Sequence, residues 1–266
     1  MKKTQSLLTV LFVLLLGMFT FQDLAISNVL FNPESTFGWF FESFGELILA
    51  YMGAFSAFAL LKINWKKSWW KKIGFGLLAV YNVLTGAFLS KVHLDLTMII
   101  FVLLLVIYFV VFGYLATRIQ EKDYEVVRKI AIVGVILSLA PIVIVTLLKM
   151  LWGRERYRAM TDPATQFTPW YAIQKFTTDN ERMSFPSGHA ANSATMVWIT
   201  LLPLWLKGLK KYETLIVWFT GAWIACVMLS RVIVGAHFAS DVLMGATITL
   251  MLFYVLKNKF FGKEIN

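Results

Sequence analysis

The sequence predicts an all-α fold, a multi-pass transmembrane bundle of about eight helices, and three observations lead to this prediction. Of 266 residues, 59% are hydrophobic and 15% are charged, against roughly 25% charged residues in soluble domains. The apolar residues gather in eight runs, most of them close to the ~20 residues that a bilayer span needs. The connections between these runs are short and hold most of the Lys and Arg residues. One soluble core cannot bury this much apolar sequence, so we expect an integral membrane protein.

Each apolar run is expected to form one helix. In chain order the runs cover approximately 5–21, 45–61, 73–90, 96–117, 130–148, 189–206, 214–232 and 238–256. The first run follows two lysines and lacks a small-x-small cleavage site after it, so we expect an uncleaved anchor and not a signal peptide. The third run is interrupted by Asn82, Thr85 and Gly86 and is expected to pack inside the bundle. Pro141 in the fifth run and Pro203 in the sixth are expected to kink their helices.

The distribution of basic residues predicts the orientation of the chain. Seventeen of the 25 Lys and Arg residues fall in one alternate set of connections, which also holds both termini. Basic connections stay in the cytoplasm, so both termini are expected there. The exception is 149–185, which is external by parity yet holds six cations. The net charge of +10 does not indicate a nucleic-acid partner, because these cations lie in membrane loops and not on one soluble face. The single Cys226 excludes an intramolecular disulfide.

Three polar clusters fall on the same predicted external side. The first runs from Lys149 to Arg156, the second is Phe-Pro-Ser-Gly-His at 185–189, and the third is Ser230-Arg231 followed by His237 and Asp241. If a helix begins near His237, then Asp241 lies one turn further on the same face, within hydrogen-bond reach. Such a carboxylate fixes the tautomer of its histidine and leaves the other ring nitrogen free to attack.

The second cluster allows two interpretations. Ser187 has the position of a helix N-cap, and the same backbone geometry forms an anion site with the first N–H groups of the helix. Gly188 allows close approach of that backbone, and His189 faces the same space. Lys149, Arg156 and Arg231 supply one point cation and two planar guanidinium groups suited to phosphate oxygens.

These clusters resemble the three-part signature of the type 2 phosphatidic acid phosphatase superfamily, which also includes vanadium haloperoxidases. That signature is Lys-x6-Arg-Pro, Pro-Ser-Gly-His and Ser-Arg-x5-His-x3-Asp. The sequence agrees in order and spacing, except that Tyr157 replaces the family proline. The matching positions are Lys149, Arg156, Pro186, Ser187, Gly188, His189, Ser230, Arg231, His237 and Asp241.

The resemblance implies a fold, an activity and residue roles. It implies a six-helix phosphatase core within the bundle, and we assign 1–128 to an N-terminal transmembrane region and 129–259 to the catalytic domain. It also implies that His237 attacks phosphorus with support from Asp241, and that His189 serves as general acid and then general base. Phosphate would be held by Lys149, Arg156, Arg231, Ser187 and Gly188. No metal or other cofactor is expected, because three cations provide the neutralisation that Mg²⁺ provides elsewhere. His93 has no motif around it and is expected to be incidental.

The expected substrate is a membrane lipid phosphate, with the bilayer itself as the other partner. Undecaprenyl diphosphate, phosphatidylglycerophosphate and phosphatidic acid are equally compatible with these residues. A lipid phosphotransferase using the same intermediate is the alternative enzyme, whereas a haloperoxidase is expected to be less apolar. An anion transporter would instead require ionisable residues near the middle of a span. The sequence does not predict an oligomeric state.

Overall fold

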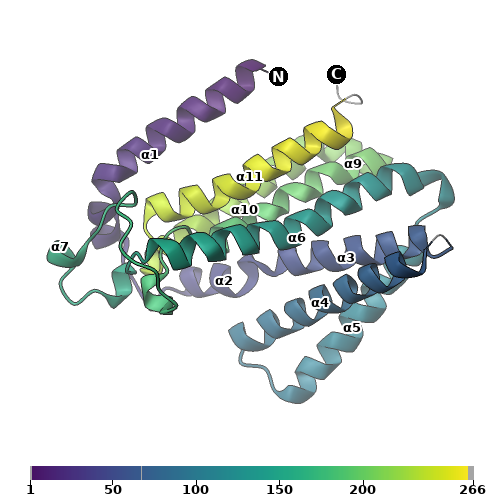
Figure 1. The fold of residues 1–266 in the computed structure, drawn as a ribbon, viewed down its shortest axis with the longest axis horizontal. Helices are drawn as coiled ribbons and strands as arrows, with labels where there is room; N and C mark the ends of the chain where they lie inside the picture. The colour runs from purple at the N-terminus through teal and green to yellow at the C-terminus, as the bar shows by residue number, and fades with distance from the viewer. Residues whose placement is uncertain (1, 67, 263–266) are drawn as a thin grey trace.

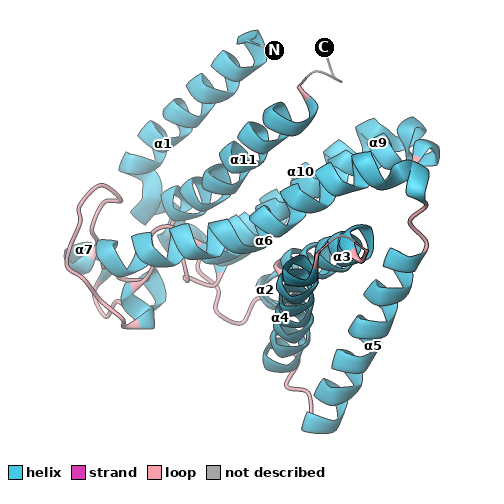
Figure 2. Ribbon diagram, turned by 45° about the vertical axis from the view of Figure 1, so that its right-hand side comes forward, coloured by secondary structure: helices cyan, strands magenta, loops and turns pink. Residues whose placement is uncertain are grey.

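The structure is a computed structural model that describes residues 2–66 and 68–262, and its regular elements there are helices without any strand (Figure 2). The α-helices of this part of the chain are α1 (Lys2–Leu30), α2 (Thr36–Gly45), α3 (Leu47–Asn64), α4 (Trp69–His93), α5 (Met98–Thr117), α6 (Tyr124–Trp152), α7 (Pro163–Gln166), α8 (Gly188–Ala194), α9 (Leu202–Trp205), α10 (Glu213–Ile233) and α11 (Ala239–Phe261). Short 3₁₀ segments link several of them, at Glu121–Asp123, Tyr157–Ala159, Asn180–Arg182, Thr195–Leu201 and Lys207–Tyr212.

Seven helical segments of the described chain are long and apolar enough to cross a membrane, which confirms the all-α, multi-pass prediction. They are Thr9–Leu30, Thr36–Asn64, Trp69–His93, Met98–Thr117, Glu121–Trp152, Lys207–Ile233 and Ala239–Phe261. The run expected at 189–206 is also helical, but it is divided into α8, a 3₁₀ segment and α9. Pro203 lies at the start of α9, where its missing N–H leaves no helical hydrogen bond unmade.

The ends of the bundle are distinct. Helix α7 marks one end, and α9 and the last turns of α11 lie towards the opposite end (Figure 1). Gly188, the first residue of α8, belongs to the α7 end, because the backbone N–H of Ser187 is bonded to Asp241 at the start of α11. The chain from α8 to α9 therefore runs from one end of the bundle to the other.

The centre of the bundle is α3, in which most residues are buried. In the span Thr36–Asn64, formed by α2 and α3, 78% of the most apolar stretch is buried, whereas none of the corresponding stretch of α5 is buried. Close approach of α3 and α4 depends on Gly53, because a Cβ there would lie 1.9 Å from Asn82 Oδ1. The expectation that the third run packs inside the bundle is only half right. Asn82 and Gly86 face α3 from one side of α4, and the other side of α4 exposes apolar side chains such as Leu77.

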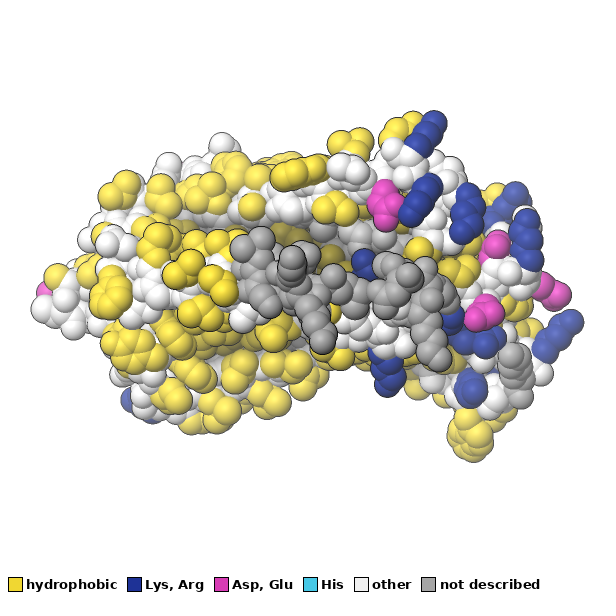
Figure 3. Space-filling view, turned by 90° about the horizontal axis from the view of Figure 1, so that it is seen from above, with side chains coloured by type: hydrophobic (Ala, Val, Ile, Leu, Met, Phe, Trp, Pro, Cys, Tyr) yellow, Lys and Arg dark blue, Asp and Glu magenta, His cyan; other side chains and the backbone are white. Residues whose placement is uncertain are grey.

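The surface is apolar around the middle of the bundle and cationic near one end. Seen from above, hydrophobic side chains cover most of the face, and Lys and Arg gather near the end opposite α7 (Figure 3). Exposed Val, Leu, Ile and Phe side chains on α5 and α10 are unfavourable in water, but they suit contact with lipid chains. The surface cations and the Ser187–Asp241 contact therefore lie at opposite ends of the bundle.

Candidate active site

The three sequence clusters come together at the α7 end of the bundle. Lys149 lies in the last turn of α6, and Gly153 ends that helix in the left-handed conformation at φ +65°. Arg231 lies in the last turn of α10, and Asp241 in the first turn of α11. Gly245 on α11 lies so close to the Ser187 backbone that a Cβ would fall 2.2 Å from the Ser187 carbonyl oxygen. This close packing brings the second and third clusters into one site.

His237 is 1% exposed and lies in the turn between α10 and α11. Its Nδ1 is 2.7 Å from the Ser184 carbonyl oxygen. A carbonyl only accepts hydrogen bonds, so a neutral His237 ring carries its proton on Nδ1 and keeps a free lone pair on Nε2. Burial lowers the pKa of His237 well below its usual value, and the positive charges of Lys149, Arg156 and Arg231 lower it further. The ring is therefore neutral, with a free lone pair on Nε2, within the field of the three cations.

The expected hydrogen bond between His237 and Asp241 is absent. Asp241 Oδ2 is 3.9 Å from His237 Nδ1, because this oxygen already accepts hydrogen bonds from Ser184 Oγ at 2.5 Å and the Phe238 backbone N–H at 2.8 Å. Helix α11 begins at Ala239 and not at His237, so Asp241 caps its own helix. The carboxylate acts on the ring through its charge, and the Ser184 carbonyl orients the ring.

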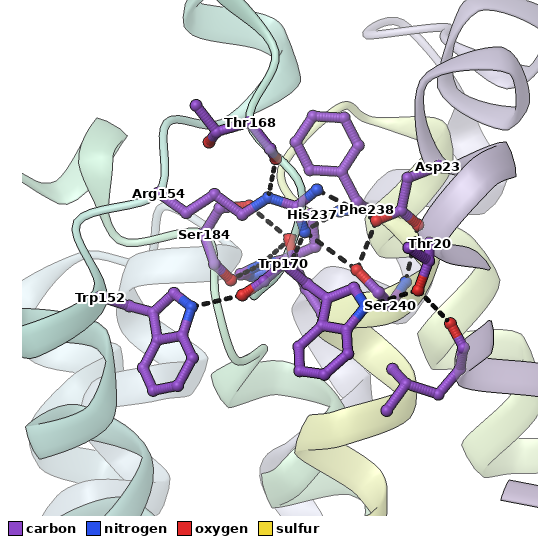
Figure 4. A network of polar contacts seen from close by, with 12 residues as sticks. Thr20, Asp23, Trp152, Arg154, Thr168, Trp170, Ser184, His237, Phe238 and Ser240 are labelled. Carbon is purple, nitrogen blue, oxygen red and sulfur yellow. Dashed lines mark hydrogen bonds and ion pairs between the residues drawn. The ribbon is translucent and has the colours of Figure 1, made fainter. Parts of the chain in front are cut away.

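Arg154 is a central residue that sequence reasoning did not identify. Its side chain is completely buried and donates to Asp241 Oδ1 at 2.5 Å, to Asp23 Oδ2 at 3.0 Å and to Ser240 Oγ at 2.9 Å (Figure 4). The guanidinium also lies 4.1 Å from the centroid of the Phe238 ring. Asp23 comes from α1 and accepts further hydrogen bonds from the backbone N–H and the hydroxyl of Ser240. The first helix of the chain is thus connected to Asp241 through one buried cation.

His189 faces a second carboxylate that the sequence did not reveal. Its Nε2 is 3.6 Å from Oε1 of Glu46, a buried residue between α2 and α3. Glu46 Oε2 accepts a hydrogen bond from Asn192 at 2.9 Å. His93 Nε2 lies 3.5 Å from the same Oε1, and its ring centroid is 6.1 Å from that of His189. His93, the last residue of α4, therefore lies beside His189, a position that its sequence context did not predict.

Both arginines of the predicted phosphate site are buried and only partly satisfied. Arg156 donates to Asn180 Oδ1 at 3.0 Å, and Arg231 forms an ion pair with Glu42 at 3.0 Å. The Nε atom of each guanidinium is buried without a hydrogen-bond partner among the described residues. Burial, together with the neighbouring Arg158, lowers the pKa of Arg156 to about 10, so this group stays cationic at neutral pH. Buried donors without acceptors are rare in native proteins, and they are suited to an anionic ligand.

Ser187, Gly188 and Lys149 complete the set of predicted phosphate ligands. Ser187 Oγ accepts the Ala190 N–H at 3.3 Å as the N-cap of α8, and its hydroxyl hydrogen remains able to donate. The N-cap and anion-site interpretations are therefore compatible. A Cβ added at Gly188 would lie 3.7 Å from Lys149 Nζ, which places this ammonium group beside the first turn of α8.

Tyr157, at the position of the family proline, connects the loop to α1. Its hydroxyl donates to Asn28 Oδ1 at 2.9 Å, and its ring packs edge-on against Phe31 at 5.1 Å. The loop aromatic Trp170 donates to Thr20 Oγ1 on the same helix at 2.8 Å. The loop that holds Arg154 and Arg156 is therefore held against α1 by several side chains.

Comparison with known proteins supports the assignment made from the motifs. Residues 129–264 match the family described as the PAP2 superfamily. The chain is also similar to phosphatidylglycerophosphatase B of Bacillus subtilis (strain 168), with 38% identity over 76 residues. That similarity covers 28% of this chain and 37% of the relative. No solved structure matches the chain.

Proposed function

The chain belongs to the PAP2 superfamily, and from this premise we propose that it is an integral membrane phosphatase acting on a lipid phosphate or diphosphate. One observation supports this most strongly. A buried neutral histidine lies within the field of Lys149, Arg156 and Arg231, and two of these cations have unpaired, buried N–H donors. Such a site favours a tetrahedral oxyanion beside a nucleophile.

The proposed reaction has two steps. In the first, Nε2 of His237 attacks phosphorus, the bond from phosphorus to the lipid oxygen breaks, and His189 gives a proton to the departing oxygen. In the second, His189 takes a proton from water, the water oxygen bonds to phosphorus, and the P–N bond breaks to release phosphate. Each step returns His189 to the protonation state that the next step requires.

The surrounding residues stabilise the charges that develop. The Ser184 carbonyl oxygen accepts a hydrogen bond from Nδ1–H of His237, and Asp241 favours the positive charge of the phosphorylated ring from 3.9 Å. Glu46 does the same for protonated His189, from 3.6 Å. The three cations hold the phosphoryl oxygens, where negative charge is concentrated during transfer. Ser187 and the Gly188 N–H supply the remaining donors in this proposal.

The substrate class remains open to three lipids. Undecaprenyl diphosphate, phosphatidylglycerophosphate and phosphatidic acid all place a phosphate at the membrane surface with an apolar tail in the bilayer. The Bacillus relative is a phosphatidylglycerophosphatase, which supports testing phosphatidylglycerophosphate first. We also place the catalytic domain at 129–259, although Asp23, Glu42 and Glu46 reach the site from the preceding region.

The test is release of inorganic phosphate from each lipid by the purified chain in detergent, with EDTA present. We expect turnover of at least one lipid and inhibition by vanadate, which adopts the trigonal-bipyramidal geometry of the transferring group. Variants H189A and H237A serve as inactive controls. Absence of phosphate release from all three lipids would contradict the proposal, and complete loss of activity in EDTA would contradict metal-free catalysis.

A lipid phosphotransferase remains the second candidate, because it would use the same phosphohistidine. Radiolabelled phosphate from the substrate would then appear on an acceptor lipid and not in water. The absence of labelled lipid under turnover conditions favours the hydrolase.

A further inference from the structure

Two imidazoles and one carboxylate from separate parts of the chain lie close together. Glu46 lies between α2 and α3, His93 is the last residue of α4, and His189 is the second residue of α8. Nε2 of His93 is 3.5 Å from Glu46 Oε1, and Nε2 of His189 is 3.6 Å from the same oxygen. One nitrogen or oxygen from each residue lies within 4.8 Å of the other two.

Polar atoms at this centre are buried without full pairing. Glu46 is buried, and its ion-pair partners in the described part of the chain are His93 and His189. Arg231, a nearby cation, is already paired with Glu42 at 3.0 Å. His189 Nε2 is buried without a hydrogen-bond partner among the described residues. Burying such a polar atom without a partner is costly, so the site favours a ligand that binds the His189 nitrogen and the Glu46 carboxylate together.

The geometry fits a transition-metal ion. Zn²⁺ binds His nitrogen and carboxylate oxygen at about 2.0–2.1 Å, which separates tetrahedral ligand atoms by roughly 3.4 Å. The two separations at Glu46 Oε1 exceed this value by only one or two tenths of an ångström. Asn192 holds the other oxygen, Oε2, at 2.9 Å, so Oε1 is directed towards both rings. Two His and one carboxylate form a set that Zn²⁺ uses with its fourth position open to water, whereas Mg²⁺ and Ca²⁺ require mostly oxygen ligands.

We propose that Glu46, His93 and His189 bind a divalent transition-metal ion, best matched by Zn²⁺, and that the bound ion inhibits the enzyme. The inhibition rests on the function proposed above, in which His189 must carry a proton to the departing oxygen. A metal bound to Nε2 takes the lone pair that would hold this proton. Binding itself depends only on the three side chains, so it can be measured independently of activity.

The experiment uses the purified full chain in detergent, stripped of metal with EDTA and then freed of the chelator. Zn²⁺ binding is measured by calorimetry, and Co²⁺ binding by the visible absorption of a tetrahedral nitrogen and oxygen site. We expect one ion per chain and at least tenfold weaker binding in the H93Q and E46Q variants. The matched control is E34Q, which neutralises an exposed acid in the loop between α1 and α2 and should bind as the unaltered chain does.

Activity is then measured with and without Zn²⁺. His93 has no role in the proposed reaction, so H93Q should keep its basal rate. The Zn²⁺ concentration that halves its activity should be at least tenfold higher than for the unaltered chain. A chain that hydrolyses lipid phosphate but binds neither ion below millimolar concentration would overturn the metal site and leave the proposed function intact. Unchanged binding in both H93Q and E46Q would overturn this set of ligands. Binding of one ion by a chain without phosphatase activity would support the site and remove the proposed function.

Discussion

At the scale of single residues, the site separates the two histidines by their partners. His237 is oriented by a neutral carbonyl, that of Ser184, and is surrounded by cations, so its neutral form is favoured. Burial lowers the pKa of His189 to about 4, and the charge of Glu46, whose Oε1 lies 3.6 Å from Nε2, opposes that shift. The two rings therefore differ in their nearest partner, and the proposed division between nucleophile and general acid relies on this difference.

The protonation of His237 can be measured directly. Because burial and three cations lower its pKa well below 6.5, the ring should stay neutral at pH 6, where an ordinary histidine is largely protonated. The chain has only three histidines, so ¹⁵N spectra of histidine-labelled protein are simple, and H237Q identifies the relevant signals. A midpoint for His237 at or above 6.5 would contradict the arrangement of charges described here.

At the scale of elements, α1 is connected to Asp241 through the buried guanidinium of Arg154. Asp23 and Asp241 share Arg154, so two carboxylates surround one guanidinium. Asp23 accepts hydrogen bonds from Arg154 and from the Ser240 backbone N–H. We expect the group of three to keep one net negative charge near His237, which would favour the positive phosphorylated ring. Asp23 is therefore a candidate positioning and charge-balancing residue.

Removing the charge of Asp23 should slow the reaction without affecting binding. In D23N the Arg154–Asp241 pair becomes neutral, so we expect kcat to fall on the order of tenfold, equivalent to about 1.4 kcal/mol of transition-state stabilisation, with little change in KM. Steady-state kinetics and accumulation of the phosphorylated enzyme measure this effect.

The matched control for D23N is T20V, which removes another polar contact between α1 and the loop, that of Thr20 with Trp170. T20V should keep its kcat. Equal losses in both variants would show that α1 acts only through general packing, and a pure KM effect in D23N would remove the role in charge balance.

The sequence predicted the long spans because twenty apolar residues in succession have few alternatives to a membrane helix. The sequence did not predict the features of these helices that depend on tertiary contacts. The division of 189–206 into α8, a 3₁₀ segment and α9 depends on local packing, and the burial of α4 on one side follows from its contact with α3.

The residues of the candidate site also fall into two groups, those that the motifs predicted and those that only the fold brings to the site. Lys149, Arg156, His189, Arg231, His237 and Asp241 were found because they stand at fixed spacings in three motifs. Asp23, Glu42, Glu46 and His93 lie outside those motifs, far from them in sequence, and only folding brings them to the site. Arg154 lies inside the first motif, but its identity as a buried partner of Asp241 depends on distances that spacing does not provide.

At the scale of the whole molecule, the two ends of the bundle differ in charge. Lys and Arg gather near the end opposite α7 (Figure 3), and the proposed site lies at the α7 end. The positive-inside tendency then supports a cytoplasmic location for both termini and an extracytoplasmic site. A lipid phosphate of the outer leaflet would enter from the membrane surface at the α7 end.

This orientation is tested with reporter fusions at the C-terminus in bacterial cells. Green fluorescent protein, which becomes fluorescent in the cytoplasm, should be bright, and alkaline phosphatase, which requires the periplasm, should be inactive. Fusion after residue 166, beyond α7, should give the opposite pair of results. An active alkaline phosphatase at the C-terminus would contradict the proposed orientation.

Covalent labelling of His237 tests the central claim most directly. Purified protein is mixed with lipid carrying ³²P in its terminal phosphate, quenched in alkali within milliseconds to seconds, digested and analysed by mass spectrometry. We predict acid-labile label on the peptide that contains His237, and in H237A no label and a loss of turnover on the order of 10³-fold or more. Label on another residue, or an H237A variant that retains most of its turnover, would contradict the account.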